Sequence, residues 1–361
     1  MTNLSHPLPL RRGAPMKNRF MLAPLTNQQS HADGTLSDVE FHWLTKRSEG
    51  GFALTMTCAA HVQKGGQAFE GQLGIWSDAH LPGLSRLAAA IRANGSLSAV
   101  QLHHGGRRSE PPLTGEPRLA PFDDAETGAA ALTTAQVEQL RADFIAAAVR
   151  AERAGFDGVE LHGAHGYMLC SFLDADNNHR TDGYGGSFEH RCRLLFEIVE
   201  GVRAATGPGF QLGVRISPER FGIRLAEARE LARRLLAGGQ LDYLDLSLWD
   251  VFKEPAEDGF AGTELIDHFV DLPRNGTALG VAGKITTAAT AQKCLDRGAD
   301  FVLIGRGAVL HHDFPRLAIA DPAFTARPLP VSPAMLAAEG LSPAFITYMR
   351  NWKGFVSEEP A

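Results

Sequence analysis

The sequence has few cysteines, and their spacing excludes several kinds of protein. Only four occur in 361 residues, at Cys58, Cys170, Cys192 and Cys294, and no two of them form a Cys-x-x-Cys pair. A small secreted domain held by disulfides uses many more, and a zinc ribbon or an iron–sulfur cluster needs cysteines at close, regular spacing. We therefore expect reduced thiols and a cytoplasmic location.

Long hydrophobic runs and an excess of positive charge are also absent. No apolar stretch approaches the length of a membrane span, and the first sixteen residues, with Pro7, Pro9 and Pro15, have no apolar core of signal-peptide length. The formal net charge of -6 gives no reason to expect nucleic acid or an anionic membrane as a partner. The partner that we expect is a small-molecule substrate.

The sequence does contain a repeated alternation of short apolar runs and amphipathic stretches. Strand followed by helix, eight times, is typical of a (β/α)8 TIM barrel. The strand-like runs are Arg19–Ala23, Phe52–Ala60, Ser96–His103, Phe156–His162, Gln211–Ser217, Leu241–Leu248, Leu279–Ile285 and Phe301–Gly305. The helical stretches are Ser37–Ser48, Leu81–Asn94, Thr134–Ala154, Ser187–Thr206, Leu225–Ala237, Glu264–Leu272, Thr287–Arg297 and Ala308–Ile319.

Such a barrel accounts for the whole chain as a single domain, residues 1–361. The barrel would span about 18–320, after a short lead-in that caps its lower end and before a C-terminal extension at about 321–361. An open doubly wound sheet is the alternative, but no Gly-x-Gly-x-x-Gly turn follows the first strand. The longest irregular segment, 107–132, follows the third strand, and we expect it over the barrel mouth.

The most informative stretch runs from Gly155 to Tyr167. Alternate side chains of a strand face opposite ways, so Glu160 and His162 share one face, and His165 and Tyr167 follow in the loop beyond its carboxyl end. Two neutral imidazoles can donate hydrogen bonds to one carbonyl oxygen, and a phenol can supply a proton. We interpret this stretch as an electrophilic pocket with a general acid.

The flanking strands bring two more polar side chains to the same face. Gln101 in the third strand and Arg215 in the fifth are expected to point inward beside Glu160. Burying an arginine without a partner is very costly. Arg215 therefore needs an electron-rich ligand or, as the alternative, an ion pair with a carboxylate such as Glu160.

Glycine and a cation stand together at the ends of the seventh and eighth strands, as Gly283-Lys284 and Gly305-Arg306. Glycine lets a backbone approach a ligand closely, and the loops after these two strands commonly bind phosphate in barrels. We interpret both pairs as a phosphate site. The alternative is that these glycines only turn the chain.

The histidines also allow a different class of protein. His162 and His165 could bind a metal if His103 or His104 supplied a third ligand, which would make a metal-dependent lyase or hydrolase. No acidic cluster and no His-Glu-x-x-His pattern supports this alternative, so we expect no metal. A purely structural role for the two histidines is the simplest alternative.

Longer motifs resemble a known family. The stretches 162–167 (His-Gly-Ala-His-Gly-Tyr) and 178–187 (Asn-His-Arg-Thr-Asp-Gly-Tyr-Gly-Gly-Ser) are similar to those of the old yellow enzyme family of FMN-dependent ene-reductases. The stretches 21–26, 101–107 and 304–306 agree with it, so that the resemblance covers most of the chain. We expect the second motif to be a scaffold, in which Arg180 and Asp182 fix a loop to the helix that starts at Ser187.

The resemblance implies which residues hold FMN. Thr26 would lie near the redox-active edge of the flavin, Ala59 and Gln101 at its pyrimidine end, and Arg215 where negative charge collects on reduction. The complete set that the resemblance implies is Ala23, Pro24, Leu25, Thr26, Ala59, Gln101, Arg215, Gly283, Lys284, Gly305 and Arg306.

The resemblance also implies a reaction. Hydride would pass from NADH or NADPH to FMN, and then to the β-carbon of an α,β-unsaturated carbonyl compound. His162 and His165 would bind the carbonyl oxygen, and Tyr167 would donate the proton. The alternatives are flavin-dependent oxidation of an amine or of a saturated or hydroxylated substrate, and a barrel that binds its ligand only as a scaffold.

The C-terminal tail 348–352 (Tyr-Met-Arg-Asn-Trp) is similar to that of one subgroup, in which an arginine reaches the neighbouring subunit's site. This similarity implies that Arg350 binds substrate in a homo-oligomer, a dimer or a tetramer; alternatively, Arg350 is simply exposed on a terminal helix. Thr26 and Gln28 stand where that subgroup usually has a cysteine and a substrate-contacting tyrosine. We expect Gln28 to contact the substrate, and Thr26 matches the other main subgroup.

Overall fold

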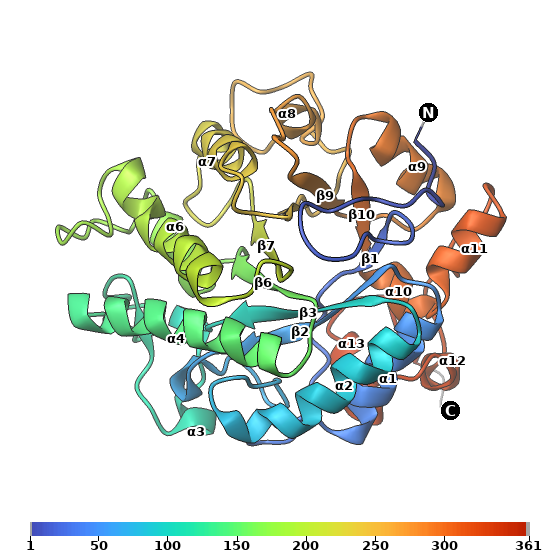
Figure 1. Ribbon diagram of the computed structural model, residues 1–361, viewed down its shortest axis with the longest axis horizontal. Coiled ribbons are helices and arrows are strands. Elements are labelled where there is room, and N and C mark those ends of the chain that lie inside the picture. The colour runs from blue at the N-terminus through green and yellow to red at the C-terminus, as the bar shows by residue number, and fades with distance from the viewer. Residues whose placement is uncertain (1, 359–361) are drawn as a thin grey trace.

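The computed structural model describes residues 2–358 and shows a closed barrel of eight parallel strands (Figure 1). Around the barrel the strands follow the order β1-β10-β9-β8-β7-β6-β3-β2. Their bounds are β1 (Phe20–Leu22), β2 (Leu54–His61), β3 (Leu97–His103), β6 (Gly158–Gly163), β7 (Gln211–Ile216), β8 (Tyr243–Ser247), β9 (Ala278–Ala282) and β10 (Phe301–Ile304). Each strand overlaps one of the eight predicted runs, so the predicted TIM barrel is confirmed.

Helices surround the strands in Figure 1. Several begin where a Ser or Thr side chain accepts a hydrogen bond from a first-turn N–H that has no intrahelical partner, as at Ser37, Thr133, Ser187 and Thr287. The main helices are α1 (Asp38–Glu49), α2 (Leu81–Ala93), α4 (Thr134–Arg153), α6 (Phe188–Ala205), α7 (Leu225–Ala237), α8 (Asp267–Val270), α9 (Ala288–Asp296), α10 (Arg306–Leu310) and α11 (Phe314–Ala320). Within residues 2–358, no helix is long and apolar enough to cross a membrane.

Two of the predicted helices are wrong in extent. The stretch Glu264–Leu272 forms only α8, because the first part of the stretch makes turns: the N–H groups of Asp267 and Phe269 donate to carbonyl oxygens three residues earlier, at 3.0 Å and 3.1 Å, rather than four. The stretch Ala308–Ile319 forms two helices, α10 and α11. Pro315 lies in the first turn of α11, and its lack of an N–H is tolerated at that position but not inside one continuous helix.

The long segment after β3 is ordered by contacts with the 178–187 motif. It contains α3 (Pro111–Thr114) and a two-stranded sheet of β4 (Leu119–Ala120) and β5 (Ala130–Ala131). Arg180 donates from Nη1 to the carbonyl oxygens of Pro121 at 2.8 Å and Leu132 at 2.5 Å, and it also pairs with Asp182. Asp182 in turn accepts from Thr134 at 2.7 Å, at the start of α4. The motif therefore holds the segment against the barrel.

The N-terminal lead-in packs into the lower end of the barrel, as predicted. Leu8 and Met16 pair with each other across a short bridge and join the buried cluster inside the strands. Above them, the ring of Tyr243 lies over Gly213. A Cβ at Gly213 would lie 2.1 Å from Cε2 of that ring, so only glycine fits there. The lower interior is filled in this way, whereas a large cavity opens at the carboxyl ends of the strands.

The C-terminal extension contains α12 (Pro333–Ala338) and α13 (Pro343–Met349), which lie beside α1 in Figure 1. One further short helix, α5 (Met168–Leu173), follows β6. Phe345 of α13 packs edge-on against Trp43 of α1, with ring centroids 4.8 Å apart. The N–H of Ser342 donates to the side chain of Gln29 at 3.0 Å. These contacts direct the end of α13 toward the barrel mouth.

Candidate active site

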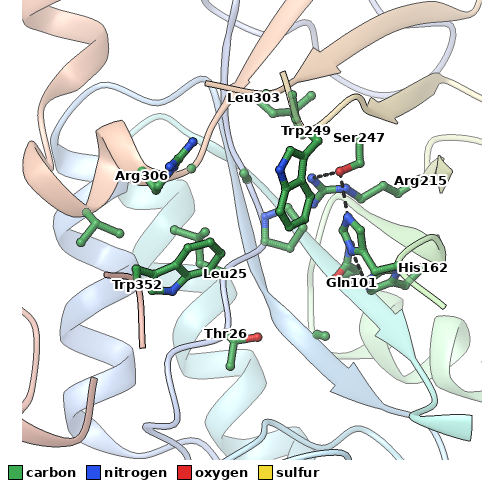
Figure 2. A pocket seen from close by; sticks show the side chains of 18 of the residues that line it. Leu25, Thr26, Gln101, His162, Arg215, Ser247, Trp249, Leu303, Arg306 and Trp352 are labelled. Atoms are coloured by element: carbon green, nitrogen blue, oxygen red, sulfur yellow. Dashed lines mark hydrogen bonds between the residues drawn. The ribbon is translucent and has the colours of Figure 1, made fainter. Parts of the chain in front are cut away.

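A cavity of about 660 Å³ opens at the carboxyl ends of the strands (Figure 2). Its size falls in the range of about 300–1,000 Å³ that is typical of small-molecule sites. His162, His165 and Tyr167 line it, as do all the residues expected to hold FMN: Ala23, Pro24, Leu25, Thr26, Ala59, Gln101, Arg215, Gly283, Lys284, Gly305 and Arg306.

The floor of the cavity is a row of buried polar side chains on adjacent strands. In the register of the barrel, Gln101 of β3 lies opposite Glu160 of β6, and Arg215 of β7 lies opposite Asp245 of β8. The amide of Gln101 donates to Oε1 of Glu160 at 2.8 Å, and Nε of Arg215 lies 3.0 Å from Oδ2 of Asp245. The ion pair that was the alternative for Arg215 is therefore present, but its partner is Asp245 and not Glu160.

The two floor carboxylates share one arginine, and all three side chains are buried. Burial raises the pKa of Glu160 to about 8, with a further contribution from the negative charge of Asp245. Burial also raises the pKa of Asp245 to about 6, and the neighbouring Arg215 limits that rise. Burial therefore favours a protonated carboxyl in this pair, and the positive charge of Arg215 opposes that shift at both groups.

The two histidines form a hydrogen-bonded chain that ends at Arg215. The N–H of Ala164 points at Nδ1 of His162 at 3.3 Å, so a neutral His162 carries its proton on Nε2. That nitrogen lies 3.4 Å from Nδ1 of His165, whose Nε2 lies 2.8 Å from Oγ of Ser247. Arg215 reaches the same oxygen at 3.4 Å, as the dashed lines in Figure 2 show.

The electrostatics of this wall keep the imidazoles neutral. Burial lowers the pKa of His165 to about 3 and holds that of His162 well below its ordinary value, and the positive charges of Arg215 and Arg108 act in the same direction on both. A neutral imidazole can still donate a hydrogen bond, and the neutral form is favoured here because the region is already electropositive.

Tyr167 lies against the first of these histidines. Its ring centroid is 5.2 Å from that of His162 and 4.4 Å from that of His103, and the guanidinium of Arg108 lies 4.6 Å above its face. Burial raises the pKa of Tyr167, although Arg108 opposes the shift. The phenol is therefore protonated at neutral pH and available as a donor.

The opposite end of the cavity carries the glycine–cation pairs. Lys284 lies 2.9 Å from the carboxylate of Asp250, whereas Arg306 forms no ion pair with any residue in the described range 2–358. Arg306 is also the first residue of α10, in which the first intrahelical hydrogen bond runs from the N–H of Ala308 to the carbonyl oxygen of Gly305 at 2.9 Å. The N–H groups of Arg306 and Gly307 precede that bond. Figure 2 shows its side chain on the side of the cavity away from His162.

Gln28 and Arg350 are not brought together with the other predicted residues. Gln28 takes a positive φ of 55° next to Asn27, which is held by Glu40, and the chain turns away from the cavity there. Arg350 is exposed at the end of α13, with Nη1 3.5 Å from the carbonyl oxygen of Ser357. Its neighbours Tyr348, Met349 and Trp352 do line the cavity.

Sequence reasoning missed several lining or floor residues, and for Asp245 and Ser247 a signal existed. The period-two rule places Tyr243, Asp245 and Ser247 of β8 on one face, as it does the residues of the neighbouring strands. Ala282 of β9, Leu303 of β10 and Phe345, Tyr348 and Met349 of α13 also line the cavity and were not singled out. A further group of missed lining residues lies outside the strands and α-helices, where no periodicity predicts direction: Phe69, Arg108, Arg220, Phe221, Trp249 and Trp352.

The chain matches the model of the NADH:flavin oxidoreductase / NADH oxidase family over residues 3–320. It belongs to this family. It is 35% identical over 314 residues to YqiG of Bacillus subtilis (strain 168), named a probable NADH-dependent flavin oxidoreductase, with 84% of each chain covered. It is also 35% identical over 331 residues to an NADPH dehydrogenase of Bacillus pumilus (strain SAFR-032), and the aligned region covers 89% of this chain and 95% of the dehydrogenase. An old yellow enzyme homologue from Zymomonas mobilis has a TM-score of 0.80 at 26% identity, over 95% of this chain and 99% of the other.

Family membership confirms the resemblance to the old yellow enzymes. The chain is a flavin oxidoreductase that uses FMN and a reduced nicotinamide, NADH or NADPH. The metal-dependent lyase considered as an alternative is therefore wrong. In the part of the chain that the structure describes, no three His, Cys, Asp or Glu side chains form a group that could hold a metal ion.

The cavity suits FMN in both shape and charge. Pro24, Leu25 and Leu303 give it apolar walls against which a flat ring can pack. Five cationic side chains line it and no carboxylate does, because Glu160 and Asp245 of the floor are fully buried and do not reach the cavity surface. This lining suits a ligand with a phosphate dianion. Arg306, which has no ion-pair partner among residues 2–358, would be buried against that phosphate.

Proposed function

We propose that the enzyme is an ene-reductase, which reduces the carbon–carbon double bond of an α,β-unsaturated carbonyl compound with NADH or NADPH. The observation that carries this proposal is the wall formed by His162, His165 and Tyr167, with two neutral imidazoles and a protonated phenol in one cavity. Bound FMN supplies the hydride transfer from the nicotinamide to the β-carbon.

The positions of the lining residues support an assignment for each part of the cofactor. Ala23, Pro24, Leu25, Thr26 and Ala59 would pack against the ring, and Gln101 and Arg215 would face its pyrimidine end. Gly283, Lys284, Gly305 and Arg306 would hold the phosphate. Arg215 would favour the reduced cofactor, because a positive charge beside that end of the ring would stabilise the negative charge that reduction adds.

His162 and His165 would bind the substrate's carbonyl oxygen. Addition of hydride to the β-carbon moves negative charge onto this oxygen, and a well-placed donor there contributes about 2.7–4 kcal/mol to the transition state. To make these bonds, the Nε2–H groups of the two histidines exchange their present acceptors, His165 and Ser247, for the substrate oxygen. No net desolvation is required, since both groups are buried already.

Tyr167 would donate its phenolic proton to the α-carbon. A positioned acid of this kind typically accelerates a step by about 10²–10⁴-fold. Arg108, stacked on the ring and donating to the carbonyl oxygen of His165 at 3.1 Å, would hold the phenol in place and stabilise the phenolate after transfer. The proton then returns from solvent.

The test begins with purified protein. We expect a yellow protein that releases FMN on denaturation. After anaerobic reduction with NADH or NADPH, it should be reoxidised by cyclohexenone, a nitroalkene or a maleimide. Reduction of the bound FMN by an amine in place of the nicotinamide, without reoxidation by any alkene, would show that the enzyme is an amine oxidase instead. A protein that binds FMN but undergoes neither reaction would be a scaffold.

We also propose that Arg350 acts in a homo-oligomer. Its exposed position at the end of α13, beside three residues that line the cavity, supports a contact with a neighbouring subunit's site. Sedimentation of the FMN-loaded protein should show a dimer or a tetramer. Arg350→Ala should weaken substrate binding without loss of bound FMN, and a monomeric wild-type enzyme would rule the arrangement out.

A further inference from the structure

Two loops at the cavity mouth hold three residues in a backbone conformation that non-glycine residues rarely adopt. Arg220 and Phe221, after β7, have φ angles of 68° and 54°, and Trp249, after β8, has a φ angle of 66°. Such a residue costs of order 1–3 kcal/mol and persists only where its surroundings hold it, most often at a functional site. All three line the cavity.

The surroundings of these loops do hold them. Arg220 and Ile223 form a short antiparallel bridge, with the N–H of Ile223 2.9 Å from the carbonyl oxygen of Arg220. The side chain of Glu219 bonds to Lys253 and accepts from the N–H of Ala256 at 2.7 Å, which ties the loop after β7 to the loop after β8. Hydrogen bonds therefore fix the conformation of both loops on this side of the mouth.

The surface of these loops presents a cation and two exposed aromatic rings. The guanidinium carbon of Arg220 lies 5.2 Å from the ring centroid of Trp249, within the range of a cation–π contact. Trp249 is 53% exposed and Phe221 is 39% exposed. Figure 2 shows the indole of Trp249 near Arg215 and Leu303 in the view into the cavity.

The other cations of the cavity already have partners or an assigned ligand. Arg215 pairs with a floor carboxylate, Lys284 pairs with Asp250, and Arg108 donates to a backbone carbonyl beside Tyr167. Arg306 lies at the phosphate end. Arg220 is different, because within residues 2–358 its side chain forms neither an ion pair nor a hydrogen bond.

This surface adjoins the wall that carries the histidines. β7 pairs directly with β6, and a Cβ at Gly166 would lie 2.9 Å from Cδ1 of Phe221. Phe221 therefore packs against the turn between His165 and Tyr167. A substrate whose carbonyl oxygen lies at the histidines can extend along Phe221 and Trp249 toward Arg220.

We propose that Arg220, Trp249 and Phe221 form a substrate subsite, and that the substrate is a flat α,β-unsaturated carbonyl compound carrying a carboxylate. The inference rests on the proposed function and names its substrate class. The two rings cover the flat part of the molecule, and the guanidinium, which forms strong bonds with carboxylates, binds the charged end.

Two matched substrates test the subsite, 4-carboxycinnamaldehyde and its methyl ester, which differ in charge at one end. Arg220→Asn removes the cation, and asparagine tolerates a positive φ, so the loop conformation is retained. With FMN-loaded enzyme, this variant should lower kcat/KM for the acid by about 10- to 100-fold and for the ester by less than about twofold. Arg220→Lys should recover part of the loss.

Arg224→Gln is the matched control, because Arg224 is an exposed arginine near the same loop that pairs with Asp176 and does not line the cavity. It should leave the ratio of acid to ester unchanged. Trp249→Leu should lower kcat/KM for both aldehydes by a similar factor, because it removes the ring but not the charge.

Binding provides a readout that does not depend on turnover. 4-Hydroxybenzoate and methyl 4-hydroxybenzoate should be titrated into the oxidised, FMN-loaded enzyme and followed by the absorbance of the flavin. Arg220→Asn should weaken binding of 4-hydroxybenzoate but not of its methyl ester. Added salt should weaken binding of 4-hydroxybenzoate to the wild-type enzyme more than to the variant.

The failures of the two proposals are distinguishable. If the loaded enzyme reduces enones but Arg220→Asn leaves the acid-to-ester ratio unchanged, the subsite is wrong and the proposed function stands. If the loaded enzyme reduces no activated alkene, the proposed function is wrong, and the ratio of the two dissociation constants then decides the subsite by itself.

Discussion

The floor and the mouth of the cavity each present an arginine to the same space, but they hold it in opposite ways. Arg215 is buried on β7 with Asp245 at 3.0 Å and a second carboxylate, Glu160, nearby. Arg220 is exposed on the following loop, where its guanidinium faces the ring of Trp249 and forms no ion pair with any residue in the range 2–358.

The difference follows from solvation. A charge removed from water must be compensated by the protein itself, so each charged side chain of the floor needs its protein partner whether or not a ligand is bound. A charge at the mouth is solvated until a ligand displaces the water. The floor should therefore govern stability and cofactor chemistry, whereas the mouth should govern which substrate binds. Four substitutions test this comparison.

The largest effect on stability should come from Asp245→Ala. It leaves Arg215 buried without its ion-pair partner, and breaking a buried pair in this way typically lowers the free energy of unfolding by about 3–5 kcal/mol. Urea titration of the cofactor-free variant measures it. Asp176→Ala, which removes the partner of the exposed Arg224, should cost less than about 1 kcal/mol. Equal losses for the two variants would contradict the distinction between floor and mouth.

Tyr167→Phe tests the wall of His162, His165 and Tyr167, which lies between the floor and the mouth. Reduction of the alkene should slow by about 10²–10⁴-fold, while reduction of bound FMN by the nicotinamide stays near the wild-type rate. Stopped-flow absorbance measures the two half-reactions separately. Tyr348→Phe, a second phenol that lines the cavity, should leave both rates nearly unchanged. Similar losses in both half-reactions would mean that Tyr167 has a structural role.

The floor should also make stability depend on pH. The pKa of Glu160 is raised from 4.5 to about 8, so between these values the folded protein keeps a proton that the unfolded chain releases. The free energy of unfolding should therefore fall as pH rises through this window, by up to about 1.4 kcal/mol per pH unit for one proton. Asp245, raised from 3.8 to about 6, adds to the fall in the lower part of the window.

Glu160→Gln should flatten this dependence between pH 6 and pH 8, where the Glu160 proton is the one being lost. Urea titrations at the two pH values measure the change, with the exposed Glu126→Gln as the control. A slope as steep in Glu160→Gln as in wild type would assign the titration to another group.

The smallest effect on stability should come from the mouth. Trp249→Phe should change the free energy of unfolding by no more than about 0.5 kcal/mol, because the indole is mostly exposed. Trp43→Phe should cost more, since the indole of Trp43 is almost fully buried under Phe345. A large loss of unfolding free energy in Trp249→Phe would show that this ring stabilises the fold and does not serve ligand binding.

The floor was largely predictable and the mouth was not. Strand periodicity correctly placed Gln101, His162 and Arg215 toward one space, and the same rule applied to β8 would have found Asp245 and Ser247. No period governs the loops that carry Arg220 and Trp249, whose direction depends on left-handed backbone angles imposed by neighbouring segments. The division of Ala308–Ile319 into two helices was signalled by Pro315, whereas the shortening of α8 was not.

The sequence by itself determined the barrel and the family, because alternating apolar strands and capped helices are local patterns and the motif residues are consecutive. It also determined that histidines, a tyrosine and an arginine would meet at the carboxyl ends of the strands, since parallel strands in a closed barrel bring their ends together. Only the tertiary structure decided which carboxylate pairs with Arg215 and which cation stays available at the mouth. Those choices depend on register, on burial and on contacts between loops far apart in the chain, and no local pattern of residues encodes them.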